Sequence, residues 1–124
     1  MKKYKELMNE GSDFMLDLFD EEIDSDNEKF LVTTGVDDGE ATVTVERYDN
    51  PDDNDTEVVA TAFYEIYDEE VLKDSGIEVS GWGKKNKTAI HNIINKEFDG
   101  AAFSNNREVE NSLDIVVKKL SKIY

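Results

Sequence analysis

Apolar residues recur at steps of three and four over the first 22 positions of the chain. This spacing places them on one face of an amphipathic helix, which we expect from about Lys2 to about Glu22. The residues on that face are Tyr4, Leu7, Met8, Gly11, Met15, Leu18 and Phe19. Short polar residues follow from Asp24 to Glu28, and their side chains compete for backbone hydrogen bonds, so the helix should end there.

Alternating patterns then predict β-strands. Residues 29–36 and 41–48 read as two strands, since Val43 and Val45 alternate with Thr44 and Glu46 in the second. The turn between them, residues 37–40, contains Asp38–Gly39, which tolerates the positive φ angles of a tight hairpin.

Two further strands are expected after an acidic loop at residues 49–57. Val58 to Tyr67 is rich in β-branched and aromatic residues on both faces, which favours a position inside the sheet. Asp68 to Ser75 reads as a charged connection that could hold one helical turn. Ile77 to Trp82 reads as a fourth, short strand.

Helical periodicity returns from Lys84 onward. A second helix carries its apolar stripe at Ala89, Ile90, Ile93, Ile94 and Phe98, and Gly100 is placed to close it. A third helix should begin at Asn105, which forms a capping pair with Glu108, and continue to Tyr124. A strand over Leu113, Ile115 and Val117 is the alternative for this last segment.

These elements predict one α+β domain of 124 residues. It consists of an amino-terminal amphipathic helix at residues 2–22, an antiparallel sheet of three to four strands at residues 29–82, and a helical part at residues 84–124 packed on the sheet. The sequence contains neither an internal repeat nor a linker that would divide it.

The charge of the chain is confined to one region. Residues 10–78 hold 24 acidic and three basic residues, whereas the nine residues before them carry a net +2 and the 46 residues after them a net +3. The whole chain has a net charge of −16. Such a balance disfavours direct binding of nucleic acid or of an anionic membrane surface, so we expect a basic partner protein.

Composition points to the cytoplasm. The chain has no cysteine, no run of about 18 apolar residues that could cross a membrane, and no apolar segment behind its first lysines that would fit a secretory signal. The oligomeric state is open between a monomer and a homodimer, because the charge resists self-association whereas exposed edge strands could pair.

Catalytic, metal and cofactor sites are not expected. Loops starting at Asp24 or Asp53 lack the glycine and the final glutamate of a calcium-binding loop. Residues 81–88 resemble a phosphate-binding loop only superficially, since no glycine precedes Lys87–Thr88, and a basic helix start after a bend is the better interpretation. His91 is the sole histidine and should face solvent, which leaves no partners for a triad or a zinc site. We therefore expect a protein that is not an enzyme.

The acidic residues are instead candidates for partner binding. Solubility is the plainer interpretation of surface carboxylates, but acidity that serves solubility alone should spread along the chain. Carboxylates arranged on a helix face and on hairpin loops can imitate the charge of duplex DNA, which carries one phosphate per ~1.7 Å of helix axis. The candidate partner-binding residues are Asp17, Asp20, Glu21, Asp24, Asp37, Asp38, Glu40, Asp49, Asp52, Asp53, Asp55, Glu57, Asp68, Glu69 and Glu70.

This combination of small size, absence of cysteine, an amphipathic first helix (residues 2–8) and acidic loops is similar to phage-encoded anti-CRISPR proteins and other acidic DNA mimics. The resemblance implies an inhibitor that occupies the DNA-binding groove of an RNA-guided nuclease. An immunity protein that neutralises a basic nuclease toxin, or a structural or adaptor module of a mobile element, is the alternative.

Overall fold

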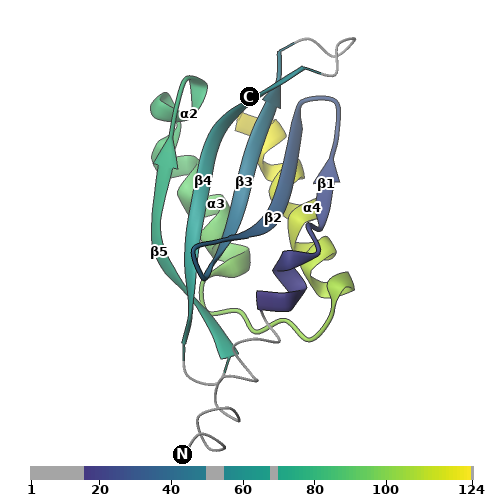
Figure 1. Cartoon of the computed structure of the whole chain (residues 1–124). Helices are drawn as coiled ribbons and strands as arrows, with labels where there is room; N and C mark the ends of the chain where they lie inside the picture. Colours follow the sequence, from purple (N-terminus) through teal and green to yellow (C-terminus); the bar gives the residue numbers. More distant parts are fainter. Residues whose placement is uncertain (1–15, 50–54, 68–69, 124) are drawn as a thin grey trace, which may run out of the picture.

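One antiparallel sheet of five strands organises the molecule in the computed structural model, which describes residues 16–49, 55–67 and 70–123. Figure 1 shows the strands side by side in chain order. They are β1 (Asp24–Asp26), β2 (Phe30–Asp37), β3 (Glu40–Tyr48), β4 (Thr56–Tyr67) and β5 (Val71–Val79). The α+β class is confirmed, although the sheet has five strands rather than the three to four expected.

The helices in the described residues cover the same face of the sheet (Figure 1). The short α2 (Trp82–Lys85) contacts β4, α3 (Lys87–Phe98) lies against β4 and β5, and α4 (Asn106–Ile123) lies against β1 and β2. Residues 16–20 are also helical, which confirms the end of the first predicted helix, whereas residues 2–15 lie outside the described residues. Among the described segments, no helix is long and apolar enough to cross a membrane.

The core fills the space between the sheet and these helices. Alternate strand residues such as Val32, Val43 and Val45 are fully buried, because every second side chain points to the helical side. The helices contribute the stripes predicted from their periodicity. An aromatic cluster closes one end of the core, with Phe98 at 5.4 Å from Phe103, 6.0 Å from Tyr64 and 6.4 Å from Phe19 between ring centroids.

The predicted turn, helix end and helix cap, which depend on local backbone conformation, are confirmed. Asp38 and Gly39 have φ angles of 55° and 82°, as the tight turn between β2 and β3 requires. Gly100 has a φ of 81° just after α3. The Asn105 side chain accepts a hydrogen bond from the Glu108 amide at 3.0 Å, so α4 begins where the capping pair predicted and the alternative strand is wrong.

Two strands depart from the prediction. β1 lies in the polar segment after the first helix, and Ser25 on β1 donates a hydrogen bond to Asp114 of α4. β5 begins at Val71, so the segment predicted as a connection is largely strand and Trp82 lies in α2. Ser75 is the extra residue of a bulge in β5, because Phe63 lies opposite Gly76 while Tyr64 lies opposite Asp74.

Candidate functional site

The strands build a largely polar surface on the face of the sheet that points away from the helices. Residues that lie opposite each other on neighbouring strands share a face, so the register identifies the outward side chains. One row crosses all five strands and consists of Asp24, Thr33, Thr44, Thr61 and Glu78. We call it the threonine row, and we call the whole outward side of the sheet the open face.

Two rows flank the threonine row. On one side are Gly35, Thr42, Phe63 and Gly76, and on the other are Asp26, Leu31, Glu46 and Val58. The three central threonines are half-buried, whereas Val32 and Val45 in the adjacent inward row are fully buried. A polar hollow of about 440 Å³ lies over β2 and β3, where Asp24, Thr33 and Thr44 contribute to its lining. The open face therefore combines a hydroxyl-rich floor with carboxylates at its edges.

Negative charge dominates the open face. Its carboxylates are Asp24, Asp26, Asp37, Glu40, Glu46, Glu65 and Glu78. Lys73, which lies opposite Glu65, is the basic residue that the described strands present there. Two further basic residues, Lys29 just before β2 and Arg47 on β3, turn to the helical side. Lys29 donates to the Ser121 carbonyl of α4, and the Arg47 guanidinium lies 5.9 Å from the ring centre of Trp82.

The predicted partner-binding residues occupy the two ends of the sheet. At one end lie Asp17, Asp20 and Glu21 beside the first helix, together with Asp37, Asp38, Glu40 and Glu70 at the hairpins (Figure 1). At the other end lie Asp49, Asp55 and Glu57, and strands of nine residues such as β3 separate the two groups by roughly 30 Å. Asp52, Asp53, Asp68 and Glu69 lie outside the described residues.

Three predicted positions differ in detail. Asp24 was expected in the polar segment that ends the first helix, but it lies in β1 at one end of the threonine row. The Glu57 carboxylate lies against Gly81 on the side of α2, so it does not contribute to the open face. The Oε2 atom of Glu40 is buried and accepts no hydrogen bond from the described residues.

Four carboxylates that connect the two ends were missed as candidates: Asp26, Glu46, Glu65 and Glu78. They lie on strands rather than on loops. The register places each of them on the same face of the sheet as the threonine row. The alternation of Val43 and Val45 with Thr44 and Glu46 was the signal that could have found Glu46, whereas pairing between strands brings Asp26, Glu65 and Glu78 to the same face. Asp26 also accepts a hydrogen bond from the Tyr48 hydroxyl at 3.4 Å, and desolvation together with the charge of Asp26 raises the pKa of Tyr48.

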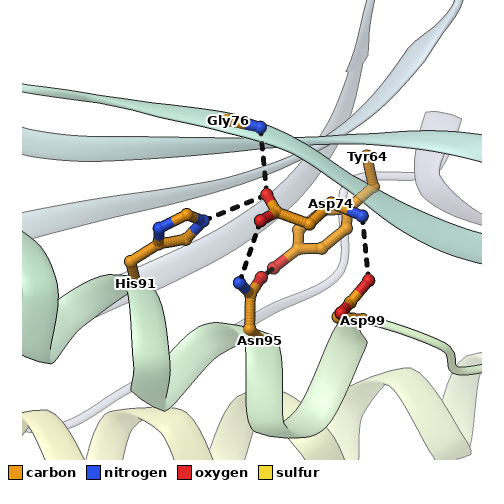
Figure 2. A network of polar contacts seen from close by, with 6 residues as sticks. All are labelled: Tyr64, Asp74, Gly76, His91, Asn95 and Asp99. Atoms are coloured by element: carbon orange, nitrogen blue, oxygen red, sulfur yellow. Dashed lines mark hydrogen bonds and ion pairs between the residues drawn. The ribbon is translucent and has the colours of Figure 1, made fainter.

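A second polar cluster joins β5 to α3. Figure 2 shows Asp74 at its centre, where Oδ1 contacts His91 Nε2 at 3.0 Å and accepts from the Gly76 amide at 2.9 Å. Asn95 donates to Oδ2 of Asp74 at 3.2 Å and accepts from the Tyr64 hydroxyl at 2.5 Å. The expectation that His91 faces solvent is therefore wrong, because its side chain is 25% exposed and bound to Asp74.

The protonation states in this cluster suit a structural role. Partial burial alone raises the pKa of Asp74, but hydrogen bonds from His91, the Gly76 amide and Asn95 outweigh it and hold the pKa below its usual range. Burial, with the charges of Asp74 and Asp99, raises the pKa of Tyr64, so its hydroxyl remains a donor. Tyr64 is fully buried, and its bond to Asn95 together with the contacts of Asp74 fastens α3 to the sheet.

The basic segment that follows β5 forms a separate corner of the molecule. Exposed Lys84, Lys85 and Lys87 surround a hollow of about 510 Å³ at the start of α3. A Cβ atom on Gly83 would lie 1.9 Å from the Val59 carbonyl oxygen, so this glycine is required for the close approach of α2 to β4. Packing thus accounts for Gly83 without a bound phosphate.

Groups of three or more acidic or histidine side chains that could hold a metal ion are absent from residues 16–49, 55–67 and 70–123. Comparison with protein-family models, with curated proteins and with solved structures finds no match to this chain.

Proposed function

We propose that this protein is a small acidic inhibitor that binds the basic nucleic-acid-binding surface of a target protein by imitating DNA. The observation that carries the proposal is the separation of charge between two layers. Residues 16–80 hold 18 acidic and three basic described residues, whereas residues 81–123 hold five acidic and eight basic ones. Solubility alone gives no reason for such a division.

The density of charge supports DNA as the imitated ligand. A duplex segment of roughly 30 Å, the length of the longer strands, carries about 18 phosphate charges. The described residues from 16 to 80, which comprise the end of the first helix and the sheet, carry a net −15 over a similar length. A field of this size attracts lysine- and arginine-lined channels and accelerates association at low salt.

The resemblance to anti-CRISPR proteins makes an RNA-guided nuclease in the cytoplasm the first target to examine. Such nucleases hold nucleic acid in a positively charged channel, which is the kind of surface that the acidic layer complements. On this proposal the protein acts by occupancy rather than by catalysis, and it needs no cofactor or metal.

Displacement of DNA tests the proposal. A fluorescent duplex bound to a guide-loaded RNA-guided nuclease should be released as the protein is added. The apparent affinity should fall by at least about tenfold between 50 and 200 mM salt, because the contact is largely electrostatic. No displacement at any salt concentration would contradict this target.

Capture from a host lysate, with and without nuclease treatment, separates the remaining functions. Retention of a basic nucleic-acid-binding protein after nuclease treatment supports the mimic. Retention of one nuclease toxin through a few strong contacts would indicate an immunity protein. Recovery of neither class would contradict the proposed function.

A further inference from the structure

Within residues 16–49, 55–67 and 70–123, helices cover one face of the sheet only, and the other face differs in chemistry between its middle and its surroundings. Its middle is a floor of threonine hydroxyls with Leu31 and Phe63, and both of these apolar side chains are half-buried. Most of its carboxylates surround this middle, on β1, β4 and β5 and at the β2–β3 turn, whereas Glu46 lies on the central strand β3. Interfaces commonly combine such a less charged centre with a charged rim.

We propose that the open face, centred on the threonine row, is the surface on which a basic nucleic-acid-binding protein docks. The inference rests on the proposed function and names its contact surface. Arginine and lysine side chains of the partner lie across Thr33, Thr44 and Thr61, and the carboxylates of Asp24 and Glu78 hold them at the two ends of the row.

Charge complementarity identifies the partner as basic. Seven carboxylates share the open face with Lys73, and two further basic residues, Lys29 and Arg47, are directed to the helical side. An acidic ligand such as nucleic acid would meet repulsion over this surface. A second copy of the chain would bring the same charges together if it docked face to face.

The spacing suits a groove-like contact. Neighbouring strands lie about 4.8 Å apart, so the carboxylates of Asp24 and Glu78 originate from backbones separated by roughly 19 Å across five strands. Strands of eight and nine residues give the face an area of roughly 600 Å². This approaches the ~800 Å² that each partner contributes to a stable protein interface.

The side chains of the open face stand on strands, whereas Asp49 and Asp55 lie just outside the ends of β3 and β4. The backbone of these strands is paired, and threonine is β-branched with a restricted χ1 angle. Binding through them therefore requires less loss of conformational entropy than binding through long acidic loops. This reason favours the open face over the carboxylates of Asp49 and Asp55 as the principal contact.

Titration of the isotopically labelled full chain with a nona-arginine peptide, followed by nuclear magnetic resonance, tests the location. The largest shifts are expected for the amides and methyl groups of Thr33, Thr44 and Thr61. Thr44→Arg should weaken peptide binding by about tenfold or more, because it adds charge and bulk at the centre of the row. Thr88→Arg, on the helical side, changes the net charge equally and should alter the affinity less than about twofold.

The outcomes separate the two proposals. Largest shifts at Asp49 and Asp55, with full binding by Thr44→Arg, would overturn the open face as the contact and leave the acidic mimic standing. Largest shifts on α3 and α4, or no binding at low salt, would overturn both. If Thr44→Arg loses its dispersed spectrum, the pair Asp24→Asn and Glu78→Gln provides the same comparison at the ends of the row.

Discussion

The two layers of this molecule use charge in opposite ways. In the sheet layer, carboxylates gather on the open face and the cations Lys29 and Arg47 turn inward. In the helical layer, exposed Lys84, Lys85 and Lys87 are accompanied by few acids, and the contacts with the sheet are mainly apolar. The helices thus supply the buried half of the core, whereas the sheet presents a surface with a negative electrostatic field.

The largest effect is expected when a helical residue is removed from the core between the two layers. Phe98→Ala should lower the free energy of unfolding by about 3–5 kcal/mol, because Phe98 is fully buried among three aromatic rings. Urea denaturation measures this effect. Ile115→Ala on α4, where the side chain is 39% exposed, is the matched control and should cost less than about 1 kcal/mol. Equal losses for the two variants would contradict the assigned core.

A pair of neighbouring substitutions contrasts the two faces of β2 directly. Val32→Thr should cost about 1–3 kcal/mol, since it places a hydroxyl in the fully buried inward row. Thr33→Val should change the stability by no more than about 0.5 kcal/mol, because Thr33 lies on the open face. Thermal unfolding of both variants checks the prediction. A larger loss for Thr33→Val would mean that the open face is packed.

The Asp74 cluster, which connects β5 to α3, should make the stability of the protein depend on pH. Asp74 has a lowered pKa in the folded protein, so its ionised form stabilises the fold above the ordinary carboxyl value of 3.8. This contribution should disappear as the pH falls from 3.8 through the lower folded value. Asp74→Asn should therefore be less stable than the wild type at pH 6, and the gap should narrow below pH 4. A gap that stays constant from pH 6 to pH 2.5 would show that ionisation of Asp74 does not matter.

The smallest effect is expected for the ion pair on the helical layer. Lys119 Nζ lies 4.0 Å from Glu97 Oε2, and the lysine side chain is 36% exposed. Glu97→Gln should change the free energy of unfolding by less than about 0.5 kcal/mol, because solvent screens such pairs. Chemical denaturation at low and moderate salt measures it. A loss above about 1 kcal/mol would indicate that charge organises the helical layer too.

Sequence patterns predicted the elements whose own residues determine their conformation. The Asp38–Gly39 turn, Gly100 and the Asn105 cap depend on local backbone preferences, and all three are confirmed. β1 could not be recognised, because its polar residues form a strand only through pairing with β2 and through the bond from Ser25 to Asp114. β5 was shortened in the prediction because the bulge at Ser75 and the inward-facing Asp74 break its alternation.

The candidate site was predicted in part for the same reason. Loop and turn acids such as Asp38 and Asp55 are conspicuous in the sequence, but they lie at opposite ends of the sheet. The register between strands, which no single strand encodes, aligns Asp24 and Glu78 with three threonines. The residues that share the open face can therefore be identified only when the pairing of the five strands is known.

The most direct test of binding through the open face compares two charge-matched double variants. The measurement is the displacement of duplex DNA from a guide-loaded RNA-guided nuclease. Asp24→Asn with Glu78→Gln removes two charges from the open face, and Glu97→Gln with Glu110→Gln removes two from the helical layer. We predict that the first pair weakens displacement by about tenfold or more and the second by less than about twofold. Equal weakening by both pairs, or none by either, would contradict a binding surface on the open face of the sheet.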